Sequence, residues 1–174
     1  MSETFALSID TSDLIKRLEQ LPQKVAKGVA IDALTDAGHV MQTAIKQAVV
    51  DRSPRGASGE PREYKLPNGN SIMPELLAED IDIDPMVSKG NKSCNVEVGP
   101  TQLTGHVARW INDGWMHVHG GRRFLHGKNR GKGIEDEQIP GTHFMEAGFD
   151  ESAKAATDVF VTKLATGIEE AFKK

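Results

Sequence analysis

Two histidines one residue apart are the first candidates for chemistry in this chain. His117 and His119 form a His-x-His pair, and His126, His143 and the acids from Glu135 to Glu137 follow it. A metal site needs several such donors to converge, and a His-x-His pair on a strand places both rings on one side. A metal-dependent hydrolase is therefore one alternative for this chain. Glycines flank the pair, and no predicted helix carries His and Glu four residues apart, so we expect surface histidines without a metal.

Motifs for nucleophilic or nucleotide chemistry do not occur in the sequence. There is no Gly-x-Ser-x-Gly elbow, no phosphate loop and no dinucleotide fingerprint. The single cysteine, Cys94, cannot form an internal disulfide, and its alternating apolar surroundings favour a buried structural thiol. We therefore expect no catalytic residue, no cofactor and no enzymatic activity.

Two clusters of like charge are the third chemical feature. The basic run contains no acid and comprises Arg122, Arg123, Lys128, Arg130 and Lys132. The acidic segment contains no basic residue and comprises Glu75, Glu79, Asp80, Asp82 and Asp84. The net charge of -4 argues against a dedicated nucleic-acid binder, although a small nucleic-acid-binding module that uses the basic run stays a second alternative. A subunit with both clusters is suited to a head-to-tail ring, in which the basic run of one copy meets the acidic segment of the next.

The first fifty residues predict a strand and two helices. Residues 5–9 alternate in polarity as a half-buried strand does, and residues 10–12 offer N-cap oxygens for a helix that begins near Asp13. Pro22 breaks that helix, because proline is tolerated only in a first turn. Apolar residues from Val25 to Ala48 then recur at helical spacing, which predicts a second, longer helix.

The remaining elements follow from changes of periodicity. Residues 51–74 and 115–139 lack apolar periodicity and are predicted as two long loops or arms. Residues 79–84 and 94–98 alternate in polarity, as the two strands of an antiparallel hairpin do. A short helix around Trp110 ends at Gly114, and a last helix carries an apolar stripe from Phe149 to Phe172.

These elements predict a single α+β domain over residues 1–174, with long amphipathic helices on one face of a small antiparallel sheet. The hydrophobic fraction of 38% and the charged fraction of 26% are those of a folded chain. No apolar run approaches the roughly 20 residues that span a bilayer, so no membrane contact is expected.

Two short motifs resemble those of a known family. Residues 107–114 resemble the helix followed by Asn-Asp-Gly, and residues 141–147 the Thr-His-Phe entry into the last helix, in tail-completion proteins of long-tailed bacteriophages. The residues concerned are Trp110, Asn112, Asp113, Gly114, Thr142, His143 and Phe144. Independently of the family, Asn, Asp and Gly together end a helix and turn the chain. Phe144 would then anchor the last helix against the sheet.

The resemblance extends to residues 13–50 and 96–100, about two thirds of the chain, and it implies a structural role. Such proteins complete the tail and join it to the head connector as six-fold rings in the neck of the virion. The implied partners are further copies of the chain, head-connector proteins and tail-tube or tail-terminator proteins, with possible non-specific contact with genomic DNA. The implied location is the virion, after synthesis in the bacterial cytoplasm. The sequence differs from the family at residues 73–77 and in the longer, more basic segment after Gly114.

Overall fold

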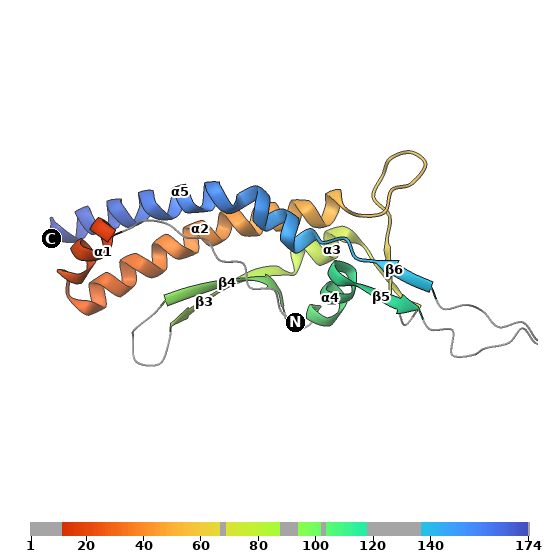
Figure 1. The fold of residues 1–174 in the computed structure, drawn as a ribbon, viewed down its shortest axis with the longest axis horizontal. Helices are drawn as coiled ribbons and strands as arrows, with labels where there is room; N and C mark the ends of the chain where they lie inside the picture. The colour runs from red at the N-terminus through yellow and green to blue at the C-terminus, as the bar shows by residue number, and fades with distance from the viewer. Residues whose placement is uncertain (1–11, 67–68, 88–93, 102–103, 118–136, 174) are drawn as a thin grey trace, which may run out of the picture.

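The structure is a computed structural model that describes residues 12–66, 69–87, 94–101, 104–117 and 137–173. Two long helices, α2 (Gln23–Asp51) and α5 (Phe144–Phe172), lie side by side in an α+β fold (Figure 1). An antiparallel hairpin of β3 (Ile81–Val87) and β4 (Cys94–Pro100) runs along α2. The predicted fold class, with long helices against a small antiparallel sheet, is confirmed.

The helix break at Pro22 is present. Helix α1 (Ser12–Glu19) ends before it, and α2 begins directly after it, with Pro22 in the extended conformation at φ -52° and ψ 133°. The reason is the fixed φ and missing N–H of proline, which place it at a helix start. The strand predicted over residues 5–9 lies outside the described residues.

Two glycines of α5 lie where this helix comes close to α2. A Cβ on Gly148 would lie 2.6 Å from the Cα of Ile45, and one on Gly167 would lie 2.7 Å from the Cγ1 of Val29. The predicted stripe of α5 is buried at Leu164 and at residues 156 and 168, but Phe172 is 53% exposed at the end of the helix. The apolar stripe therefore continues past the point where α2 covers it.

The predicted hairpin is also confirmed. Strands β3 and β4 pair with Ile83 opposite Val98 and Asp84 opposite Glu97. Opposite residues share a face, and the face with Ile83, Val96 and Val98 is half-buried. On that side a Cβ on Gly38 of α2 would lie 3.0 Å from Val96, so the missing side chain lets α2 approach the hairpin. The carboxylates of Asp84 and Glu97 are on the opposite, exposed face.

The prediction that residues 51–74 form a loop or arm without regular structure needs correction. This segment contains β1 (Tyr64–Lys65) and β2 (Ser71–Ile72), which pair with each other, and it runs into α3 (Pro74–Glu79). Tyr64 and Leu66 are only 5% and 8% exposed, so the segment is packed onto the core. Strands of two residues are too short to show a periodicity, which is why the sequence did not reveal them.

Part of the second predicted loop is likewise paired. Strands β5 (Gly114–His117) and β6 (Glu137–Pro140) form a two-stranded sheet, with His117 opposite Glu137, while residues 118–136 lie outside the description. Helix α4 (Gly105–Asp113) ends at Gly114 with φ 81°, as predicted. Among the described helices, none has the length and apolar character needed to cross a membrane.

Candidate functional site

The two motifs at residues 107–114 and 141–147 meet at one junction, although about thirty residues separate them in the chain. The N–H of Thr142 donates to the carbonyl of Ile111 at 2.9 Å, and the N–H of His143 donates to the carbonyl of Asn112 at 3.0 Å. Gly114 pairs with Pro140 at the start of the β5–β6 sheet. These contacts fix the end of α4 beside the beginning of α5.

Asn112 is the central side chain of this junction. It is 7% exposed, and its Oδ1 accepts a hydrogen bond of 2.9 Å from the N–H of Met145 in the first turn of α5. Its Nδ2 donates to Asp113 Oδ1 at 2.9 Å and to Glu146 Oε1 at 3.2 Å. The residue at the N-cap position, His143, makes no side-chain cap bond and has φ 51°. Asn112 therefore caps α5 from a distant part of the chain.

The close approach at the junction requires glycine at two positions. A Cβ on Gly114, whose φ is 81°, would lie 2.5 Å from the carbonyl oxygen of Ile139. A Cβ on Gly141 would clash with the carbonyl oxygen of Asn112. Phe144, the last residue of the motif, is fully buried in a core cluster with Ile81 of β3, so the predicted anchoring of α5 is present.

A groove of about 1150 Å³ borders this junction, and we call it the junction groove. Trp110, Ile139 and Pro140 line it beside the cations Arg52, Arg55, Arg62 and Lys65. Two of these cations donate hydrogen bonds to backbone carbonyls of the same chain. Arg52 donates to the carbonyl of Thr142 at 2.9 Å, and Arg55 donates to backbone carbonyls of residues 51 and 59, both at 3.2 Å. Arg62 and Lys65 are exposed at the rim.

Tyr64 closes the floor of the junction groove. Its hydroxyl donates a 2.7 Å hydrogen bond to the carbonyl of Val49 in the last turn of α2. Burial of the ring raises the pKa of Tyr64 to about 12. The hydroxyl therefore acts as a hydrogen-bond donor that holds the end of α2.

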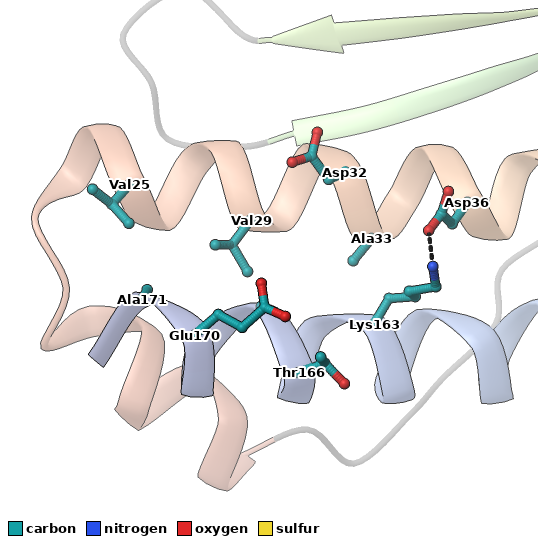
Figure 2. A pocket seen from close by; sticks show the side chains of 10 residues that line it. Val25, Val29, Asp32, Ala33, Asp36, Lys163, Thr166, Glu170 and Ala171 are labelled. Carbon is teal, nitrogen blue, oxygen red and sulfur yellow. Dashed lines mark ion pairs between the residues drawn. The ribbon is translucent and has the colours of Figure 1, made fainter. Parts of the chain in front are cut away.

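A second groove of about 540 Å³ lies between the first half of α2 and the last turns of α5, and we call it the α2/α5 groove (Figure 2). Val25, Val29, Ala33 and Ala171 provide its apolar lining, and Asp32, Asp36, Lys163 and Glu170 its charged groups. Lys163 Nζ lies 2.8 Å from Asp36 Oδ2 across the two helices. The hydrogen bond to Asp36 and its charge raise the pKa of Lys163 above its usual value. The groove therefore keeps an excess of negative charge.

The outer face of the β3–β4 hairpin is acidic. Asp82, Asp84 and Glu97 are exposed on it, and Asp84 lies directly opposite Glu97. Like charges in this position destabilise a sheet, so the hairpin itself gains nothing from them. We call these three residues the acidic hairpin face.

Asp80, which was grouped in the prediction with Glu79 and Asp82, is half-buried and is hydrogen-bonded within the chain. Its carboxylate accepts hydrogen bonds from Thr101 Oγ1, at 2.7 Å for the nearer oxygen, and from Thr104 Oγ1. These hydrogen bonds lower the pKa of Asp80 below its usual value, and the bond from Thr104 has the larger effect. Asp80 therefore ties the end of β4 to the start of α4, whereas Glu79 and Asp82 are exposed.

Other predicted residues are placed only in part. The whole basic run and two of the predicted histidines lie outside the described residues. They are Arg122, Arg123, Lys128, Arg130, Lys132, His119 and His126. His117 belongs to β5, and His143 is the N-cap residue of α5 at the junction. Within the described ranges, no group of three or more His, Cys, Asp or Glu could hold a metal. Cys94, predicted as a buried structural thiol, is half-buried at the start of β4.

Neither groove is indicated by a pattern in the sequence. Trp110 was identified within its motif, but its place beside Arg62 and Pro140 depends on a chain segment that had been predicted as a free loop. The lining of the α2/α5 groove consists of residues that helical periodicity assigns to two separate helices. In comparisons with protein-family models, curated proteins and solved structures, none matched this chain.

Proposed function

We propose that this chain is a structural virion protein of the phage neck, which completes the tail and joins it to the head connector by assembling into a ring. The observation that carries the proposal is the junction. The two motifs that resemble tail-completion proteins are far apart in sequence, yet Asn112, Thr142 and His143 form one hydrogen-bonded unit. Because the two motifs are joined by hydrogen bonds, they form one structural unit. This supports the resemblance to tail-completion proteins more than two separate short matches would.

The distribution of charge supports assembly from identical copies. Strand residues His117 and Glu137 are paired, and the basic run lies between them in the sequence. The end of β3 and the start of β4 lie on the side of the molecule away from the β5–β6 sheet (Figure 1). In the proposed ring, the basic run of one copy faces the acidic hairpin face of the next. Two different patches that complement each other generate a closed ring when the rotation between copies closes.

The other proposed partners are those of a neck component. The ring would lie between the head-connector proteins and the tail-tube or tail-terminator proteins. Basic residues that are not occupied by a neighbouring copy would contact genomic DNA through its phosphates, without sequence preference.

Electron microscopy of the virion neck tests this function. The expected result is a six-fold ring between connector and tail that is missing from particles made without this chain, which then carry unjoined heads and tails. A chain that is absent from purified virions would contradict the proposal. Stoichiometric zinc that survives dialysis and is lost in His117→Ala would also contradict it, because it would favour the hydrolase alternative.

A further inference from the structure

The α2/α5 groove has the chemistry of a peptide-binding site. Its apolar lining is open to solvent, since Val25 is 41% exposed. Asp36 is neutralised by Lys163, but Asp32 and Glu170 are exposed and form no ion pair with any described residue. In Figure 2 the Glu170 carboxylate points into the space between the two helices. A ligand that fits this groove combines large apolar side chains with positive charge.

One segment of this chain has that combination. Arg122 and Arg123 are followed directly by Phe124 and Leu125. An aromatic and an aliphatic side chain can fill an apolar groove, while the two guanidinium groups reach carboxylates at its rim. Lys128, Arg130 and Lys132 follow in the same run and add positive charge.

The segment cannot reach the groove of its own chain. It leaves β5 at His117, and Phe124 is seven residues further on, a span of at most about 25 Å for an extended chain. The groove lies around Gly167, 23 residues along α5 from Phe144, a rise of about 35 Å. The β5–β6 sheet also lies at the opposite end of the molecule from the last turns of α5 (Figure 1). Only a second copy can therefore supply the segment.

We propose that the α2/α5 groove of one copy receives residues 122–125 of the next copy, with Phe124 and Leu125 against the apolar lining and the arginines at Asp32 and Glu170. This inference rests on the proposed ring and names the contact that closes it. Plug and socket are different parts of the same chain, so the contact is heterologous and repeats around the ring.

A mixing experiment with two full-length variants tests the proposal. The plug variant carries Phe124→Ser and Leu125→Ser, and the socket variant carries Val25→Arg and Glu170→Arg, both at exposed positions of the groove. Each variant alone should self-associate roughly tenfold or more weakly than the wild type, because buried aromatic anchors supply much of the affinity of an interface. An equimolar mixture should form dimers that do not grow, because each pair has one intact plug in one intact socket. Native mass spectrometry at high protein concentration measures this.

Ile15→Arg is the matched control. Ile15 is 48% exposed, like Val25, but it lies on α1 and does not line the groove. This variant should assemble as the wild type does, and circular dichroism should show the same fold for all variants. A mixture that stays monomeric, a loss of assembly in Ile15→Arg equal to that of the socket variant, or a wild type that is monomeric at millimolar concentration would each overturn the proposal.

Cysteine cross-linking separates this contact from the proposed function. With Cys94→Ser as background, Leu125→Cys and Thr166→Cys should form an intermolecular disulfide, whereas Leu125→Cys with Ala155→Cys should not. Thr166 lines the groove, and Ala155 is exposed on α5 about three turns away. If the ring is present in the neck but the Thr166 cross-link does not form, the proposed groove contact is wrong and the proposed neck function stands. If the cross-linked oligomers form but the chain is absent from the neck, the groove contact stands and the neck function is wrong.

Discussion

Asn112 shows how a single side chain joins two distant parts of this chain. Its amide is both acceptor and donor, and it satisfies Met145 N–H, Asp113 and Glu146 at the same time. A side chain with only one of these functions could not replace it, since a carboxylate has no donor and a lysine has no acceptor. These hydrogen bonds therefore explain why the first residue of the Asn-Asp-Gly motif is asparagine.

Replacing this amide should cost stability. Asn112→Ala leaves the Met145 N–H without its partner in a largely buried place, which should lower the free energy of unfolding by about 1–3 kcal/mol. Urea unfolding followed by circular dichroism measures the change. Asn95→Ala, at an exposed position of β4, is the control and should change stability by less than about 0.5 kcal/mol. Equal losses in both variants would show that the cap contributes nothing.

Asp80 predicts a pH dependence. Its hydrogen bonds to Thr104 and Thr101 lower its pKa in the folded state below the usual 3.8. The ionised form therefore stabilises the fold above the unfolded-state pKa, and this contribution is lost as the pH falls through the lower folded-state pKa. Thermal unfolding between pH 6 and pH 2, values chosen to bracket a carboxyl group at about 4, should show a smaller acid-induced loss in Asp80→Asn than in the wild type. Parallel curves for the two proteins would contradict this role.

At the scale of elements, the pairing of α2 and α5 depends on small residues at the contact. Ser152 is buried on the same side of α5 as Gly148, and its hydroxyl donates to the carbonyl of Gly148 at 2.6 Å. Helices that approach this closely leave no room for a larger side chain at the crossing point. The separation of the two helices is therefore set by individual residues and not by the general apolar character of their faces.

Two glycine substitutions should act in opposite directions. Gly148→Ala places a Cβ 2.6 Å from a backbone atom of α2, which cannot rotate away, so a loss of about 1–3 kcal/mol is expected. Gly28→Ala has no atom within 4 Å of the new Cβ and should gain up to about 1 kcal/mol from helix propensity. Chemical denaturation of both variants measures the difference. Stabilisation by both would mean that the helices are not in close contact at residue 148.

At the scale of the whole molecule, two acidic surfaces lie near each other among the described residues. The acidic hairpin face and the α2/α5 groove lie in one part of the molecule, and Figure 2 shows the hairpin running beside α2 there. The basic run lies between β5 and β6 in the sequence. Exposed ion pairs contribute only about 0–1 kcal/mol each, so in the proposed ring they set register and association rate while apolar contacts provide affinity.

Charge reversal tests this arrangement. Asp84→Lys with Glu97→Lys should weaken ring formation and its dependence on salt, and adding Arg130→Glu with Lys132→Glu should restore assembly in part. Asp150→Lys with Glu151→Lys is the control, because these exposed acids of α5 give the same change of net charge away from the hairpin. Asp80 is left intact, since its loss would disturb the fold. Sedimentation at two salt concentrations measures assembly. If the control impairs assembly as much, only net charge matters and the proposed pairing is wrong.

The sequence by itself determined the elements whose signals are local. Apolar spacing located α2, most of α5 and the β3–β4 hairpin, and Pro22 and Gly114 marked where helices begin or end, because backbone conformation at these points depends on neighbouring residues. The two motifs around Asn112 and Phe144 were also identified, but only as separate pieces.

The tertiary structure alone decided how those pieces meet. It placed Asn112 at the start of α5, engaged Asp80 with Thr101 and Thr104, and buried Tyr64 in a segment predicted as a loop. It also formed the α2/α5 groove from residues more than 120 positions apart, such as Val29 and Gly167. Contacts of this kind depend on the relative position of whole elements. No local pattern encodes them, because each residue involved would form the same helix or turn with a different partner.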